Sequence, residues 1–425
     1  MNEVRLVLPE PVSFVLGKLR EAGFPAYVVG GSVRDTLMGR TPGDYDVTTS
    51  ARPDEMLRVF SDCRVAETGL KHGTLTVVRE GMNVEVTTYR VDGTYTDGRR
   101  PDSVSFADRL SDDLCRRDFT VNAMAWAPDH SGKDGDSGTL VDLFGGREDL
   151  ERRSIRCVGS AEERFSEDGL RILRALRFAA VLDFTCDPEC AAAVGKMAPM
   201  LEKISRERIH AEMTKLLSGP AAGRILGGFA PVIARILPPL TPQAVTEAAR
   251  IFASNAREEM GSDAVRYAVL LDSLGAEEAA RTMDSLKPSR DEKRAVTNLL
   301  VRRSFCEGRT GDPDRYAVLC LMRDTDDLFP DTLARFLCLT GRIGEEEERR
   351  IRALSADICL RDACRRLNQL QTDGAELIGL GFRGAEIGET LRDLLDRVMR
   401  GEVPNDKDAL RNELERMRDK EADHA

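Results

Sequence analysis

Apolar and polar residues follow two different periods along the chain. Over about the first 150 residues, short runs rich in valine and threonine occur at 26–30, 73–78 and 83–90, separated by glycine, aspartate and proline, as is typical of strands and turns. After about residue 160, apolar residues recur every three or four positions in segments such as 166–182 and 388–400, which predicts amphipathic helices. The pattern therefore predicts an α/β head followed by three all-helical pieces.

Clusters of glycine and proline mark the breaks between these pieces, for example at 218–220 and 311–314. A chain of 425 residues is too long for one ordinary core, so two to four domains are expected. The predicted division is a head at 1–150, a neck at 151–218, a body at 219–325 and a tail at 326–425.

The composition, with 41% apolar and 32% charged residues, is that of a globular protein. The chain starts with early acidic residues, and no apolar run approaches the length of a bilayer span. We therefore expect no signal peptide, no membrane association and a cytoplasmic location. The ten cysteines and four histidines lack the spacing of a zinc site, which predicts reduced thiols.

The net charge of −11 argues by itself against a nucleic-acid ligand. Only the face that meets phosphate must be positive, however, and arginines gather locally. They form two groups: Arg116 with Arg117, and Arg171 with Arg174 and Arg177. The charge pattern therefore permits binding of nucleic acid at a local site.

A Gly-Gly turn provides the first candidate for chemistry. A predicted buried strand ends at Val29 and runs into Gly30 and Gly31, after which a helix is expected from about Ser32. Two glycines let the backbone approach a triphosphate, whose charge suits the N–H groups at a helix N-terminus, and Arg34 adds a cation. A tight strand–helix connection without a ligand explains the same residues, and no Walker A motif is present in the sequence.

An Asp-x-Asp pair begins thirteen residues after Gly31. On an extended strand, Asp44 and Asp46 point to one face while Tyr45 points to the other. Two carboxylates on one face can hold two Mg²⁺ ions for an in-line displacement at phosphorus. Such pairs are common alone, but after a strand–Gly-Gly–helix entry they are typical of the nucleotidyltransferase superfamily. Glu85 alternates suitably for a third carboxylate, although an exposed strand glutamate fits equally.

The segment 164–180 is predicted to be a single helix with one polar sector. Asp168, Arg171, Arg174 and Arg177 recur every three positions and share that sector. A solvated charged face is one interpretation. The scarcity of acidic residues four positions away favours an anion-binding face instead. The following amphipathic segment, 204–217, is expected to pack and not to react.

Four motifs carry a resemblance to a known family: GGSVRD with GDYDV, RRDFTVNAMA, EDGLRILRALRFA and SRERIHAEM. In order and spacing they resemble the motifs of class II tRNA nucleotidyltransferases and bacterial poly(A) polymerases, over roughly the first half of the chain. The resemblance implies an α+β fold, with a polymerase-β-like head built on a mixed sheet. An all-helical neck that recognises the base, a body, and a tail that binds tRNA would follow.

The same resemblance implies roles for residues of the head. Asp44 and Asp46 would bind Mg²⁺ and act in catalysis. Gly31 and Arg34 would hold the triphosphate, and Arg117 would contact the nucleotide.

In the neck, the resemblance implies that Asp168 and Arg171 hydrogen-bond the Watson–Crick edge of the incoming base. Glu167 would orient Arg171, while Arg174 and Arg177 complete the pocket. A guanidinium beside a carboxylate offers donors and acceptors much as a complementary base does, so protein can replace a template. Cytosine and adenine both present an exocyclic amine beside a ring-nitrogen acceptor, unlike uracil and guanine.

The implied activity is addition and repair of the 3′-terminal CCA of tRNA from CTP and ATP, with release of pyrophosphate and with tRNA, not DNA, as partner. Full CCA addition is favoured over poly(A) synthesis or partial addition because 67–78 resembles the CCA-adding branch. The loop 89–104 also resembles the flexible loop of complete CCA-adding enzymes, and its residues Gly93, Asp97, Gly98, Arg99 and Arg100 suit a mobile polar element. A catalytically silent tRNA-binding protein would be supported by loss of a head aspartate, yet both are present. A small-molecule nucleotidyltransferase would leave the RRD and EDGLR motifs unexplained.

Overall fold

The computed structural model describes most of the chain, in five ranges: 2–92, 104–129, 137–255, 258–307 and 314–422. It divides into two compact units. The first comprises Met1–Arg257 with Arg281–Ser289, and the second comprises Glu258–Ala280 with Arg290–Ala425.

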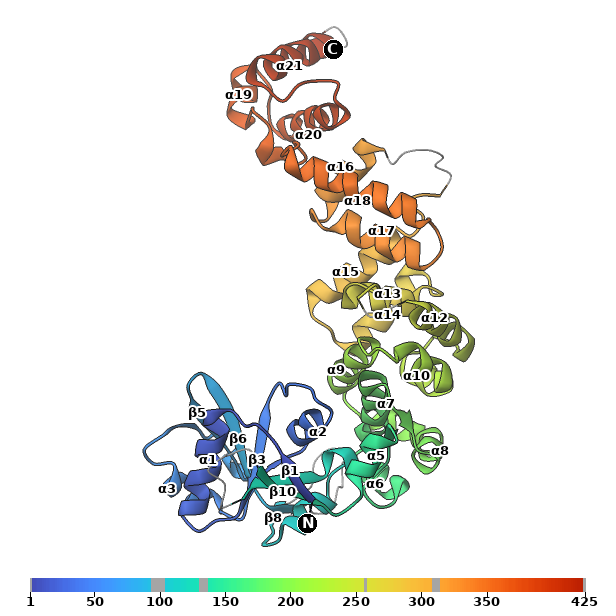
Figure 1. The fold of residues 1–425 in the computed structure, drawn as a ribbon. Helices are drawn as coiled ribbons and strands as arrows, with labels where there is room; N and C mark the ends of the chain where they lie inside the picture. The colour runs from blue at the N-terminus through green and yellow to red at the C-terminus, as the bar shows by residue number, and fades with distance from the viewer. Residues whose placement is uncertain (1, 93–103, 130–136, 256–257, 308–313, 423–425) are drawn as a thin grey trace. The chain divides into compact units, whose positions relative to one another are not determined.

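A mixed sheet organises the N-terminal part of the first unit (Figure 1). Among the described residues it has eight strands in the order β1-β10-β9-β2-β3-β6-β5-β4. The β3–β6 pair is parallel and its other pairs are antiparallel, which confirms the predicted mixed α+β head. Its strands are β1 (Asn2–Arg5), β2 (Ala26–Val29), β3 (Tyr45–Thr49), β4 (Arg64–Ala66), β5 (Thr74–Arg79), β6 (Met82–Thr88), β9 (Met124–Pro128) and β10 (Ser137–Asp142). A separate antiparallel pair consists of β7 (Arg90–Asp92) and β8 (Val104–Phe106).

The two faces of this sheet carry different side chains, because successive side chains along a strand point to opposite faces. Val28, Val47 and Val86 are buried on one face. Helices α1 (Glu10–Glu21) and α3 (Pro53–Val59) complete this core with residues such as Leu16 and Met56. The residues that flank each of these valines along its strand therefore point to the opposite face. The alternation predicted from the sequence thus leaves one face free for polar side chains.

Helices make up most of the remaining regular structure of the first unit. They are α1 (Glu10–Glu21), α2 (Gly31–Leu37), α3 (Pro53–Val59), α4 (Leu110–Cys115), α5 (Gly146–Glu151), α6 (Ala161–Glu167), α7 (Leu170–Leu182), α8 (Pro188–Met197), α9 (Arg206–Leu217), α10 (Ala222–Gly228), α11 (Ala230–Ile236) and α12 (Pro242–Ser254). The 3-10 helices are η1 (Leu70–His72), η2 (Thr120–Asn122) and η3 (Ala198–Lys203). A short parallel pair, β11 (Ser154–Ile155) and β12 (Thr185–Cys186), joins the chain before α6 to the chain after α7.

Among the described residues, the regular secondary structure of the second unit consists of helices alone. Its helices are α13 (Asp263–Leu271), α15 (Arg290–Val301), α16 (Arg315–Asp324), α17 (Phe329–Leu339), α18 (Glu345–Leu360), η4 (Leu367–Gln369), α19 (Gly374–Gly379), α20 (Ala385–Arg400) and α21 (Lys407–Ala422). Helix α14 (Ala276–Leu286) crosses the division between the units. Val318, Ile358, Leu377, Leu394 and Leu410 share one buried core in this unit.

The predicted progression from an α+β head to helical pieces is therefore confirmed. The four-part division at residues 150, 218 and 325 stays a prediction. Within the described ranges, every helix is too short or too polar to cross a lipid bilayer.

Candidate nucleotide-binding site

A polar cavity of about 660 Å³ lies in the first unit, between the free face of the sheet and the N-terminal half of α7. Side chains from β3, β6, α2, α7 and α9 line it, together with the segment after α4. All the site residues predicted from the sequence are brought together here: Gly31, Arg34, Asp44, Asp46, Arg117, Asp168, Arg171, Arg174 and Arg177. The structure thus places these residues in one cavity, while their individual roles stay predictions.

Three carboxylates stand at the sheet side of the cavity. Asp46 lies opposite Glu85 in the parallel β3–β6 register, and Asp44 directly precedes β3. Tyr45 and Val47, on the other face, are buried. Desolvation, together with the negative charges of Asp44 and Glu85, raises the pKa of Asp46 to about 6. A cation would relieve this repulsion, so the donor set fits a hard divalent ion.

A divalent cation at this place would have few protein ligands. Among the described residues, no cluster of three or more His, Cys, Asp or Glu side chains forms a ready-made metal cage. Mg²⁺ is commonly held by one or two carboxylates together with waters and substrate phosphates, so it requires no such cage. Asp44 and Asp46 are therefore suitable ligands when a triphosphate completes the coordination.

The Gly-Gly turn lies beside these carboxylates. Gly30 has φ 76° and ψ −132°, a conformation that glycine adopts without strain, and α2 starts at Gly31. A Cβ on Gly30 would stand 3.1 Å from Nη1 of Arg117. The glycine thus serves two needs, the turn itself and the close approach of the Arg117 guanidinium.

Arg34 is fixed and buried at the cavity wall, with 8% of its surface exposed. Its Nε and Nη2 donate to Asp35 at 2.8 and 3.0 Å, and its Nη1 donates to Oδ1 of Asn122 at 2.7 Å. The cation is consequently preorganised, although Asp35 offsets part of its charge.

Asp113 of α4 holds the two arginines that follow this helix. It is completely buried, accepts from Nε and Nη2 of Arg116 at 3.0 and 2.8 Å, and accepts from Nη2 of Arg117 at 3.2 Å. Burial acts to raise the pKa of Asp113, but the guanidinium groups of Arg116 and Arg117 outweigh it and lower the pKa. Asp113 also accepts from Oγ1 of Thr48, so it links these arginines to the strand of Asp46.

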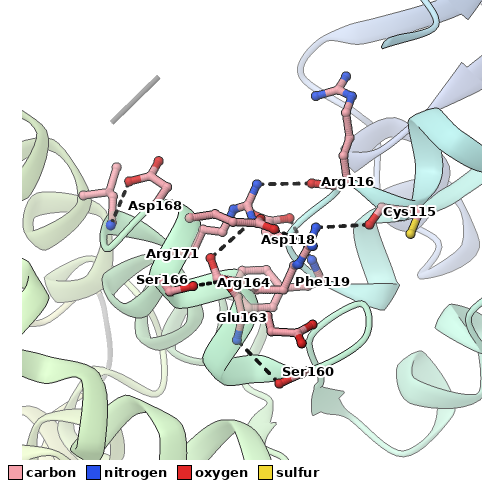
Figure 2. A network of polar contacts seen from close by, with 12 residues as sticks. Cys115, Arg116, Asp118, Phe119, Ser160, Glu163, Arg164, Ser166, Asp168 and Arg171 are labelled. Carbon is pink, nitrogen blue, oxygen red and sulfur yellow. Dashed lines mark hydrogen bonds and ion pairs between the residues drawn. The ribbon is translucent and has the colours of Figure 1, made fainter. Parts of the chain in front are cut away.

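The prediction of one continuous helix over 164–180 is wrong at Asp168. Helix α6 ends at Glu167, Asp168 adopts φ −138° and ψ 105°, and α7 begins at Leu170. The Asp168 carboxylate accepts from the backbone N–H of Leu170 at 3.0 Å, the interaction with which aspartate starts a helix (Figure 2). Asp168 therefore stands at the N-terminus of α7, and Arg171 lies within its first turn.

The scarcity of acidic residues four positions away does not leave the neck arginines unpaired, because two of their three partners come from outside the helix. Arg171 pairs with Glu167, Arg174 pairs with Asp118 at 2.6 Å, and Arg177 pairs with Glu212 at 2.9 Å. Asp118 and Glu212 escape a search of the helix itself because they come from distant positions in the chain. Each guanidinium has five N–H donors, so these pairs orient the arginines and leave donors for a ligand.

Other residues of the site were missed in the sequence. Arg208 of α9 lines the cavity and donates to Asp168 at 2.7 Å, and Glu212 lies one helical turn later. Segment 204–217 packs as α9 and also contributes to the cavity wall, and the expectation that it does not react stays a prediction. Arg208 and Glu212 both belong to the SRERIHAEM motif, which was the available signal. Phe178 was missed as well, and the guanidinium of Arg177 lies 3.5 Å from its ring centroid.

The loop expected to distinguish complete from partial CCA addition has most of its residues, 93–103, outside the described ranges. Its proposed residues were Gly93, Asp97, Gly98, Arg99 and Arg100.

Comparison with known proteins identifies relatives in two ways. The family described as the poly A polymerase head domain matches residues 26–156, and the family described as the probable RNA and SrmB-binding site of polymerase A matches 183–227. The CCA-adding enzyme of Leuconostoc mesenteroides is 36% identical over 93% of this chain and 93% of its own. That of Levilactobacillus brevis is 49% identical, over 49% of this chain and about half of its own length.

Solved structures of CCA-adding enzymes are also similar to this chain. The Bacillus stearothermophilus CCA-adding enzyme in complex with CTP superposes with a TM-score of 0.80 at 30% identity, covering 98% of this chain and all of the other. The Thermotoga maritima CCA-adding enzyme complexed with tRNA has a TM-score of 0.62 at 22% identity, over 96% of this chain and 95% of its own, and therefore supports the fold alone.

Proposed function

Since the chain belongs to the family of CCA-adding enzymes, we propose that it builds and repairs the 3′-terminal CCA of tRNA from CTP and ATP without a nucleic-acid template. The observation that carries this proposal is the single cavity in which carboxylates for a metal, a Gly-Gly turn and the Asp168–Arg171 pair converge. The CTP bound to the Bacillus stearothermophilus relative supports the choice of ligand.

The sheet side of the cavity would carry the transfer step. Asp44 and Asp46 would hold Mg²⁺, which when bound supplies a Lewis acid for the triphosphate and lowers the pKa of the attacking hydroxyl. The N–H groups at Gly31 and the cations Arg34 and Arg117 would hold the triphosphate. The 3′ oxygen of tRNA would then form a bond to the α-phosphorus as the bond to pyrophosphate breaks.

The α7 side would select the base. Asp168 offers acceptors and Arg171 offers donors, and they lie three residues apart at the start of one helix. Cytosine and adenine satisfy both groups, whereas uracil presents a carbonyl and a ring N–H to the wrong partners. Glu167 would orient Arg171, while Arg174 and Arg177, held by Asp118 and Glu212, would complete the wall of the pocket.

A direct assay tests this function. Purified protein is given tRNA that lacks its 3′ end, with each labelled nucleotide separately and with all of them together. We expect two C residues from CTP alone and a single terminal A when ATP is also present. A long A tract would instead assign the chain to poly(A) synthesis, and a product ending in CC or requiring a CC end would indicate partial addition.

The metal assignment is tested by removing its ligands. Asp44→Ala and Asp46→Ala should each abolish nucleotide addition, because charge stabilisation of this kind is typically worth several kcal/mol. Binding of tRNA should be largely intact in both variants. More than a few per cent of wild-type activity in both variants would contradict the proposal that Asp44 and Asp46 hold the metal.

A further inference from the structure

We infer that Arg164, which has no role in the proposed function, is a positioning residue for base selection that acts on Arg171 through Glu167. The inference rests on the proposed function, because it presupposes that Arg171 reads the base. Arg164 lies on α6 outside the cavity, so it would not touch the nucleotide itself.

Glu167 is held from two sides. Nη2 of Arg164 lies 2.5 Å from its Oε1, and Nη1 of Arg171 donates to its Oε2. Nη1 of Arg171 also donates to the backbone oxygen of Arg164 at 3.3 Å. Because one carboxylate bridges both guanidinium groups, the position of Arg164 restricts where Glu167, and hence Arg171, can lie.

The same two arginines bind the end of α4. Nη1 of Arg164 donates to the backbone oxygen of Cys115 at 3.3 Å, and Nη2 of Arg171 donates to that of Arg116 at 3.1 Å. Figure 2 shows both side chains directed toward these adjacent carbonyl groups. The chain then continues into Arg117, which lines the cavity beside Gly30. Arg164 therefore fixes the base-reading side chain relative to the segment that carries Arg117.

The geometry suits a positioning role better than a purely stabilising one. Only 17% of the Arg164 side chain is exposed, and its Nε is buried without a hydrogen-bond partner in the described part of the chain. Such a group is costly to bury. The two Nη atoms nevertheless reach a carboxylate and a carbonyl at once. A lysine, with one compact ammonium group, cannot reproduce this fork.

Arg171 keeps donors for a base under this arrangement. Three of its hydrogen bonds go to Glu167, Arg164 and Arg116, whereas a guanidinium has five N–H groups. The network thus fixes the plane of the Arg171 guanidinium and leaves some of its N–H donors available for a base. Loss of Arg164 should leave Arg171 charged but less well oriented, which weakens discrimination between bases more than it weakens binding of triphosphate.

The test compares Arg164→Gln, Arg164→Lys, Glu167→Gln and the double variant Arg164→Gln/Glu167→Gln. Single-turnover incorporation of CTP and UTP is measured on tRNA lacking CCA, together with thermal stability and tRNA affinity. For Arg164→Gln we expect the preference for CTP over UTP to fall about tenfold, mainly through weaker CTP binding. Arg164→Lys should lie between it and the wild type. The double variant should be no worse than Glu167→Gln, because the two residues act in series.

Arg224→Gln is the matched control. Arg224 also bridges a carbonyl and a carboxylate, those of Phe184 and Asp183, but lies outside the cavity. The variant Arg224→Gln should keep the wild-type preference for CTP over UTP. The inference would be overturned if Arg164→Gln kept the wild-type preference for CTP over UTP, or if the losses of the two single variants added in the double variant. If Arg164→Gln does not fold, an unchanged preference in Arg164→Lys would overturn the inference. A wild type that accepts UTP as readily as CTP would instead refute the proposed function.

Discussion

Asp46 has a pKa that its surroundings in the cavity raise. Desolvation comes first among the causes that raise its pKa to about 6, and the carboxylates of Asp44 and Glu85 add to it, while Arg117 opposes them. The ordinary value for the group is 3.8. The fold therefore disfavours the ionised form of Asp46 when no metal is bound, and a bound cation would stabilise that form, which is the one that coordinates a metal.

A pH-dependent gain in stability should follow from removing this charge. Because the folded pKa lies above the ordinary value, ionisation of Asp46 opposes folding: the penalty is absent below about pH 4 and complete above about pH 6. Asp46→Asn should therefore raise the melting temperature at about pH 7 without Mg²⁺ and change it much less at about pH 4. Thermal unfolding in EDTA at both values measures this. An equal difference at both pH values would show that charge is not the cause.

Base selection can be tested at Asp168 and Arg171 themselves. In the variant Asp168→Asn/Arg171→Asn, the mismatch that opposes uracil is removed, and such a mismatch is worth on the order of a few kcal/mol in a buried pocket. Rejection of UTP and GTP should relax more than triphosphate binding through Arg34 weakens. Single-turnover incorporation of all four nucleotides measures this. A less active variant with the wild-type preference for C and A would place base reading elsewhere.

At the scale of elements, α7 depends on its neighbours for the placement of its charged side chains. Helix α6 supplies Glu167, α9 supplies Arg208 and Glu212, and the segment after α4 supplies Asp118. Each carboxylate or guanidinium pairs with a group of opposite charge on α7 or at its start. The packing of α7 against α9 and α6 therefore sets the orientation of the arginines that face the cavity.

Glu212 should stabilise this packing. Only 7% of its surface is exposed, and it pairs with Arg177 at 2.9 Å and approaches Arg174 at 4.0 Å. Glu212→Gln leaves both guanidinium groups with less compensation, and we expect a loss of about 1–3 kcal/mol in unfolding free energy. Urea denaturation measures the loss. The control is Glu207→Gln on the same helix, where the pair with Lys287 is exposed and worth at most about 1 kcal/mol; equal losses in both variants would contradict the assignment.

At the scale of the whole molecule, a negative protein is proposed to bind a negative polymer. The net charge is −11, yet the cavity is lined by arginines from several elements. Binding should therefore depend on local contacts with phosphate and not on the overall field.

Strong salt dependence of tRNA binding is the expected consequence. Each phosphate neutralised should contribute about −0.7 to −0.9 to the slope of log affinity against log salt concentration. Filter binding between about 50 and 200 mM salt measures this slope. A flat curve would show that tRNA is not bound through its phosphates, whereas the same steep slope for an unrelated polyanion would show a lack of selectivity.

The sequence by itself determined what depends on neighbours along the chain. Strand alternation placed Asp44 and Asp46 on the face opposite Val47, and the glycine pair identified the turn at the start of α2. The arginines of α7 follow a helical period whether or not their partners are known. These features are local, since side-chain direction in a strand or helix is set by spacing alone.

The tertiary structure decided which groups pair across long separations. The β3–β6 register places Glu85 opposite Asp46, and packing brings Asp118 to Arg174 over 56 positions and Glu212 to Arg177 over 35. It also decided the break at Asp168, where the backbone is extended between α6 and α7 although the apolar period of the segment runs on. Periodicity carries no information about such contacts, because their partners are chosen by the packing of whole elements and not by spacing within one of them.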